Sequence, residues 1–200
     1  MNEDGATAIL RRAFARLPLS VVLLDIISPT LVQIGQGWHD GIVPVAVEHF
    51  STQVCRAHII HAMEERSNGT RKGRIIAACA PGEWHEIGLL MLTFLLRNQG
   101  WGVTYLGANL SLERFSEVME TLKPHLVLFS ASSPESANNL MELIGVLDKA
   151  EPPKPLIGLG GQAFLTDPTL ANRIPGTFFG PRADDAVHQI EGILASQIKQ

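Results

Sequence analysis

The segment APGEWHEIG, residues 80–88, places a histidine between two glutamates directly after the apolar run RIIAACA. A loop histidine can present one ring nitrogen outward while a carboxylate holds the other, which fixes the tautomer and raises its basicity toward a metal. His85 is therefore a candidate metal ligand, and Glu83 is the natural carboxylate partner. The ordinary alternative is a solvated histidine at the start of a helix, and the spacing alone is compatible with both.

Small and hydroxyl-bearing residues follow the same run and two later ones. Glycines leave room for a ligand or let the backbone approach it closely, and serines supply hydroxyl groups. Together with His85 they describe a long slot with a metal ligand at its top. The alternatives are serines that cap a helix and glycines that form ordinary turns. The candidate slot residues are Gly88, Ser130, Ser132, Gly160 and Gly161.

Five short apolar runs alternate with helix-like segments from residue 74 onward. Each run is too short for a helix, and most end in a turn signal, so we predict parallel strands joined by right-handed helical crossovers. The fold class is α/β, a flavodoxin-like (Rossmann-like) five-stranded parallel sheet of order 2-1-3-4-5. The runs are RIIAACA, GVTYLG, HLVLFS, PLIGLG and GTFFG, and the main helix-like segments are 86–98, 112–122, 135–149 and 184–199.

The predicted strand order also locates a ligand crevice. In such sheets the ligand binds beyond the carboxyl ends of the strands at the switch point, here between the first and third strands. The loops at that point are APGEWHEIG and SASSPES, residues 130–136. His85 is thus expected at the mouth of the crevice on fold grounds alone.

The N-terminal part carries helical signals in three segments, ATAILRRAFARL, SVVLLDIISPTLVQI and PVAVEHFSTQVCRAHIIHAMEER. We predict a small helical bundle over 1–68, a linker around 65–73, and the flavodoxin-like domain over 74–200. The glycines of GQGWHDG predict that Trp38 and His39 sit on a turn between two helices. The remaining histidines, among them His58 and His61, are interpreted as surface or satisfied core residues.

The composition narrows the function classes. Apolar residues make up 46% of the 200 residues, charged residues 18%, and the formal net charge is −4, which argues against direct nucleic-acid binding. Cys55 and Cys79 lack metal-type spacing and are predicted to be reduced core residues. The run LPLSVVLLDIISPTLVQI is interrupted by Asp25 and Pro29, so we interpret it as a buried helix of a cytoplasmic protein rather than a membrane span.

Two motifs carry a resemblance to known families. Glu83-x-His85-x-x-Gly88, then Ser130-x-Ser132, then Gly160-Gly161 resembles the D-x-H-x-x-G, S-x-L and G-G signature of cobalamin-binding domains in methionine synthase and certain mutases. The resemblance implies that His85 is the lower axial ligand of cobalt and that the glycines and serines accommodate the nucleotide tail. Glu83 and Ser132 depart from the usual aspartate and leucine or threonine.

The helical part is similar to a second motif. Trp38, nine residues, then Glu48-His49 resembles the W-x9-E-H motif of CarH-type light-sensing regulators, in which a helical bundle caps adenosylcobalamin. By this resemblance Trp38, Glu48 and His49 surround the adenosyl group, and His39 takes the upper cobalt site after light has removed that group. The implied protein is a photosensor, not an enzyme, that changes its self-association or its binding to a protein regulator.

The N-terminal segment differs from those regulators. The residues before Trp38 are too few for a DNA-binding domain plus the bundle, so either the chain is a piece of a longer protein or it acts without touching DNA. Three alternatives remain open: a photocobilin-like receptor that binds a bilin beside cobalamin, an AerR-like antirepressor, and a corrinoid carrier for methyl transfer.

Overall fold

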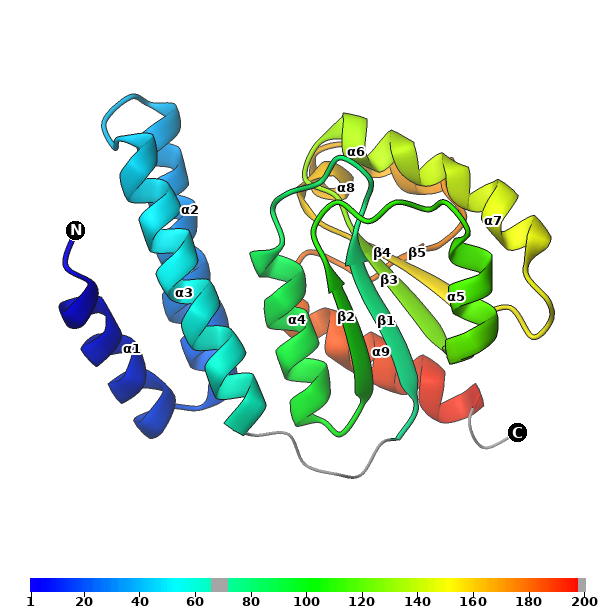
Figure 1. The fold of residues 1–200 in the computed structure, drawn as a ribbon, viewed down its shortest axis with the longest axis horizontal. Helices are drawn as coiled ribbons and strands as arrows, with labels where there is room; N and C mark the ends of the chain where they lie inside the picture. Colours follow the sequence, from blue (N-terminus) through cyan, green and yellow to red (C-terminus); the bar gives the residue numbers. More distant parts are fainter. Residues whose placement is uncertain (66–71, 198–200) are drawn as a thin grey trace. The chain divides into compact units, whose positions relative to one another are not determined.

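The computed structural model describes residues 1–65 and 72–197 and divides into two compact units, Met1–Ser67 and Asn68–Gln200 (Figure 1). The predicted linker lies mostly outside the described residues. The first unit contains α1 (Glu3–Arg16), the π-helical stretch η1 (Val21–Ile27), α2 (Ser28–His39) and α3 (Val45–Glu65). The second contains β1 (Arg74–Cys79), α4 (Ile87–Asn98), β2 (Gly102–Gly107), α5 (Phe115–Leu122), β3 (Leu126–Ser130), α6 (Pro134–Asn139), η2 (Leu140–Glu142), α7 (Leu143–Lys149), β4 (Leu156–Gly160), α8 (Gln162–Thr166), η3 (Pro168–Asn172), β5 (Thr177–Phe178) and α9 (Ala183–Gln197).

The second unit is a parallel five-stranded sheet of order β2-β1-β3-β4-β5, which confirms the predicted fold class and strand order. Helices cover both faces of the sheet (Figure 1). Ile76 and Ala78 of β1 join a buried cluster with Phe115 of α5. The alternate residues Ile75 and Ala77 are equally buried and point to the other face, where α4 and α9 contact each other. Burial on both faces explains why β1 is apolar along nearly its whole length.

The first unit is built around α3. Its buried residues Cys55, Ile59, Ala62 and Met63 recur at helical spacing and form one face. Both α1 and α2 contact α3, and α1 contributes the buried Leu10 and Phe14. The core of this unit therefore lies between α3 and its two neighbours.

The predicted buried helix over residues 20–34 is only half correct. In η1, Val22, Leu23 and Ile27 are buried, whereas α2 has no buried residue within the described chain. Pro29 has no N–H to donate, and just before it the helix widens to the π pattern, in which the Ser28 N–H reaches the Leu23 carbonyl. By length and composition alone the helix Val21–His39 could cross a membrane, a test that core helices of soluble proteins also pass.

The prediction that Trp38 and His39 sit on a turn is wrong. Both residues belong to the last turn of α2, which ends at Asp40, and the reversal follows at Gly41 with φ +72°. Gly37 remains within the helix, and its missing side chain permits close packing instead of the reversal of the chain. A Cβ at Gly37 would lie 2.7 Å from Cγ2 of Val43, which folds back onto the helix after the turn.

Candidate functional site

The strands that flank the switch point end in register. Cys79 of β1 pairs with Ser130 of β3, and Ser130 pairs with Gly160 of β4. The three loops that carry the candidate slot residues therefore start side by side at the carboxyl edge of the sheet. This is where the strand order predicts a ligand crevice.

The loop after β1 is held by its neighbours. The side chain of Asn109, which follows β2, accepts a hydrogen bond of 2.7 Å from the Gly82 N–H, and the Asn109 N–H donates to the Glu83 carbonyl at 2.8 Å. On the other side, Asn139 of α6 donates to the Pro81 carbonyl at 2.9 Å. Because separate segments fix the loop, the side chains of residues 83 and 85 have a defined orientation.

Glu83 is the centre of a hydrogen-bond network. Its Oε1 accepts bonds of 2.7 Å from both the backbone N–H and the Nδ1 of His85. Its Oε2 accepts bonds from the Oγ of Ser132 at 2.6 Å, from the Ser132 backbone N–H, and from the Oγ of Ser136 at 3.0 Å. The side chain of Glu83 is only 2% exposed, so these five donors replace the water that the carboxylate would otherwise have.

The network keeps Glu83 ionised. Burial alone would raise the pKa of the carboxyl group, but the hydrogen bonds from His85 and Ser132 outweigh it and hold the pKa well below its usual range. An ionised carboxylate can only accept, so the proton between the two side chains belongs to Nδ1 of His85. In the neutral imidazole, the acceptor nitrogen is then Nε2. With 82% of the His85 side chain exposed, the ring lies at the surface of the site.

The glycines of the site have two different roles. A Cβ built at Gly88 or at Gly160 meets nothing within 4 Å, so both positions border open space. A Cβ at Gly161 would lie 2.2 Å from the carbonyl oxygen of Ala131, and the backbone there has φ +103°. Gly161 is thus required by the close packing of two loops, whereas Gly88 and Gly160 leave a space that the protein itself does not fill.

The candidate residues of the first unit gather at one end of the helix pair α2 and α3. Trp38 is 49% exposed in the last turn of α2, and His39 is its neighbour in the chain. In the first turns of α3, Nδ1 of His49 lies 2.6 Å from Oε2 of Glu48, whose Oε1 accepts a bond of 2.8 Å from Thr52. Short reversal bonds from residues 42 and 43 to the Gly37 carbonyl bring the two helix ends together. The four motif residues are therefore grouped within this unit.

Three contributors were missed from the sequence: Ser136, Asn109 and Asn139. Ser136 also pairs with Ser133 in a capping box at the start of α6, and the pattern S-P-E-S is a recognisable signal for such a cap. Its second bond, to Glu83, depends on where α6 docks and has no local signal. Asn109 follows β2, and residues that follow a parallel strand lie at the carboxyl edge of the sheet. This position in the sequence was the available clue. Among residues 1–65 and 72–197, no group of three metal-binding side chains is suited to hold a bare metal ion.

Comparison with known proteins identifies both units. A family model described as B12 binding domain matches residues 73–188, and a second model with the same description matches residues 1–62. The chain is 28% identical over 173 residues, 86% of its length, to the HTH-type transcriptional repressor CarH of Myxococcus xanthus. It is 27% identical over 133 residues, 66% of its length, to the trimethylamine corrinoid protein of Methanosarcina barkeri. The chain spans 58% and 61% of the lengths of these two curated relatives.

A solved structure agrees with the fold. The monomethylamine corrinoid protein of Methanosarcina barkeri superposes with a TM-score of 0.78 at 17% identity, over 96% of this chain and 95% of that protein. At this identity the likeness concerns the fold alone. It covers the helical part as well as the sheet.

Proposed function

The chain belongs to the B12-binding domain family, and from that premise we propose that it is a cobalamin-dependent photosensor. His85 is assigned as the lower ligand of cobalt, and Trp38, Glu48 and His49 as residues that cover the upper face. The observation that carries the cobalamin part of the proposal is the network around Glu83, which holds the His85 ring at the carboxyl edge of the sheet. The light-sensing part is supported by the grouping of the four motif residues at one end of α2 and α3.

The residues present fit a corrinoid. His85 offers one nitrogen donor, which suits a metal whose in-plane ligands come with the cofactor itself. Gly88 and Gly160 border unfilled space on either side of the switch point, where a nucleotide tail would lie. Ser130 is the last residue of β3, Ser132 follows the strand at the same edge, and both add hydroxyl groups. Gly161 is better explained as a packing position of the loop than as a residue lining the tail.

In the sensing mechanism, the residues of the chain position the cofactor and respond to its change. When bound, adenosylcobalamin would supply a cobalt–carbon bond that light breaks. Glu83 orients the lower imidazole and raises its basicity. On the helical side, Trp38 offers a half-exposed ring and the Glu48–His49 pair offers polar groups for the adenosyl moiety. His39, the next residue after Trp38, would take the place of that moiety after its loss. The helix pair then rearranges, which changes self-association or partner binding.

The test is spectroscopic. The purified chain is loaded with adenosylcobalamin in the dark, and absorption spectra are recorded before and after green light. We expect a light-dependent spectrum in the wild type, an altered dark spectrum in His85→Ala, and wild-type behaviour in the control His188→Ala, an exposed histidine on α9. An unchanged spectrum after illumination contradicts photosensing, and an unchanged dark spectrum in His85→Ala contradicts the lower-ligand assignment.

A corrinoid carrier for methyl transfer is the second candidate. It is favoured by the similarity to the trimethylamine corrinoid protein and by the fold shared with the monomethylamine corrinoid protein. A carrier needs the lower ligand but not the residues that cover an adenosyl group. Methyl transfer to a partner enzyme that persists in Trp38→Ala, without any response to light, would favour the carrier over the photosensor.

The output of the sensor is proposed to be a change in homo-oligomerisation or in binding to a protein regulator, as in AerR-like proteins. Pull-down of a regulator that depends on the state of the cofactor would identify the second route. A co-purified pigment that absorbs red light would add a bilin, as in photocobilin-like receptors. Size-exclusion chromatography in the dark and after illumination measures the change in self-association.

A further inference from the structure

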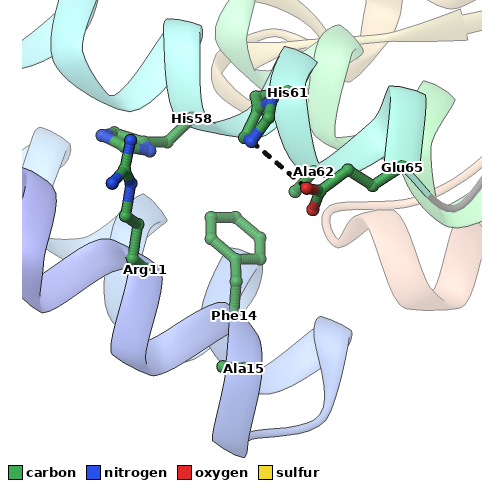
Figure 2. A pocket seen from close by; sticks show the side chains of 7 residues that line it. All are labelled: Arg11, Phe14, Ala15, His58, His61, Ala62 and Glu65. Atoms are coloured by element: carbon green, nitrogen blue, oxygen red, sulfur yellow. Dashed lines mark ion pairs between the residues drawn. The ribbon is translucent and has the colours of Figure 1, made fainter.

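A pocket lies between α1 and α3 within the helical unit (Figure 2). Its volume is about 550 Å³, within the range of small-molecule sites. The position is distinct from the motif residues at the other end of α3, since His58 lies about 14 Å along the helix from His49. The lining of the pocket includes Arg11 and Phe14 from α1 and His58, His61, Ala62 and Glu65 from α3.

The lining combines an apolar floor with polar walls. Arg11 and Phe14 are three residues apart, so they share a face of α1, and the α3 residues recur at helical spacing on the facing side. Figure 2 shows the guanidinium group of Arg11 beside the imidazole of His58, with the ring of Phe14 projecting from α1 between the helices. Phe14 and Ala62 are buried. The pocket thus offers a ring-sized apolar surface next to hydrogen-bond donors.

The pocket is lined by one permanent cation, Arg11, and one carboxylate, Glu65. The carboxylate of Glu65 lies 3.3 Å from Nε2 of His61, one turn earlier on its own helix. Within the described chain, no carboxylate forms an ion pair with Arg11. Burial, Arg11 and His61 all lower the pKa of His58, whose Nε2 contacts Oγ1 of Thr7 at 3.2 Å. At neutral pH the guanidinium of Arg11 therefore has a neutral imidazole beside it, while the carboxylate of Glu65 is engaged at His61.

We propose that this pocket binds a small organic carboxylate with an aromatic body. The carboxylate pairs with the guanidinium of Arg11, whose planar donors match two carboxylate oxygens, and His58 contributes a hydrogen bond. The aromatic body packs on Phe14 and Ala62. The site is independent of the cobalamin assignment, because all of its residues lie on α1 and α3 away from the motif residues.

The test uses the full chain with labelled histidines and follows the ring resonances of His58 and His61 by NMR. Benzoate is the probe, benzamide its uncharged analogue, and acetate its analogue without a ring. We expect saturable shifts with benzoate at millimolar concentration and at least about tenfold weaker binding of benzamide, since a charge-assisted pair contributes roughly tenfold or more. Acetate should also bind more weakly, because it lacks the ring that packs on Phe14 and Ala62.

Paired arginine variants decide the role of the guanidinium. Arg11→Gln should weaken benzoate binding at least about tenfold, whereas Arg12→Gln, an exposed neighbour that does not line the pocket, should leave it unchanged. Both arginines are exposed, so both variants should keep the wild-type circular dichroism melt. The proposal is overturned if benzoate gives no saturable shift up to about 10 mM, if benzamide or acetate binds as well as benzoate, or if the two variants bind alike.

Discussion

Each unit contains a glutamate and a histidine in close contact, but the two pairs are built differently. Glu83 and His85 are joined at 2.7 Å, and Glu48 and His49 at 2.6 Å. The Glu83 side chain is 2% exposed and also accepts bonds from Ser132 and Ser136 on other segments of the chain, whereas the Glu48 side chain is 24% exposed and its second donor is Thr52, one turn along the same helix. The distance between glutamate and histidine is therefore nearly equal in the two pairs, but the burial and the hydrogen-bond partners of the glutamate differ.

The difference concerns what fixes the histidine. At the sheet edge, three separate segments converge on the loop after β1, namely the residues after β2, the loop after β3, and α6. The imidazole of His85 is therefore oriented before any ligand arrives. On α3, the pair is local and its histidine side chain is 74% exposed, so its orientation is more easily changed. This contrast suits the proposed roles of the two pairs. His85 would be a lower ligand that the protein holds in one orientation, and Glu48 and His49 would be upper-face residues that can change theirs. The predictions below test it through the free energy of unfolding and through cobalamin binding.

The largest effect is expected for Glu83→Gln. The amide cannot accept from all five donors and leaves some of them buried without a partner, so the free energy of unfolding should fall by about 3 kcal/mol. The matched variant Glu48→Gln should lower it by less than about 1 kcal/mol, because that pair is partly exposed. Urea unfolding followed by circular dichroism measures both. Equal losses in the two variants would remove the distinction between the two pairs.

The pH dependence of stability should follow Glu83. Its folded-state pKa is depressed below the ordinary value of 4.5, so its contribution is fully present above about pH 4.5 and is lost as the pH falls below that value. The slope from this one group is at most about 1.4 kcal/mol per pH unit. Urea unfolding between about pH 3 and pH 6 should show this slope in the wild type and a shallower one in Glu83→Gln. Identical slopes would show that Glu83 is not the group that titrates.

A smaller effect is expected from removing one hydroxyl group in each unit. Ser132→Ala deletes the donor to the buried carboxylate of Glu83 and should lower the free energy of unfolding by about 1.5 kcal/mol. Thr52→Val deletes the corresponding donor to Glu48 and should lower it by about 0.5 kcal/mol or less. Cobalamin titration of Ser132→Ala should also show weaker binding, because the loop holding His85 loses a restraint. A larger loss in Thr52→Val would reverse the proposed order of the two sites.

The fold could be predicted from short-range patterns because the three central strands, β1, β3 and β4, are buried apolar runs bounded by turn residues. The predicted helix over 135–149 is instead divided into α6, η2 and α7. The break follows Asn139, whose side chain bonds the Pro81 carbonyl, a contact that depends on the docking of α6. The fifth run forms only a two-residue strand, Thr177–Phe178. Such tertiary effects leave no periodic signal in the sequence.

The candidate site was predictable where its contacts are local. Glu83 and His85 are two residues apart, which made their contact an expectation from the sequence, although the same spacing was compatible with a solvated histidine. The bond from Ser136 joins residues far apart in the chain and required the structure. Trp38 and His39 were assigned to a turn because glycines usually break helices, but Gly37 is used for close packing against Val43. A glycine that permits a close contact and one that permits a turn look the same in a sequence.

The one predicted gain in stability, and the most specific test of the preformed space, is expected for Gly88→Leu. A Cβ at Gly88 meets nothing within 4 Å, so leucine should keep the fold and raise the free energy of unfolding by up to about 1 kcal/mol through helix propensity. Gly192→Leu on α9, also open within 4 Å, is the matched control and should behave alike in unfolding. Only Gly88→Leu should weaken cobalamin binding, by at least about tenfold, because its side chain enters the space assigned to the nucleotide tail. A titration followed by absorbance measures the affinities of the two variants, and equal affinities would show that the tail does not lie beside Gly88. The dark spectrum recorded in the same titration reports separately on the bond between His85 and cobalt. If Gly88→Leu binds cobalamin more weakly but keeps the dark spectrum of the wild type, the leucine has altered the slot and left the lower ligand unchanged. The slot of the second unit would then contribute to the affinity separately from His85.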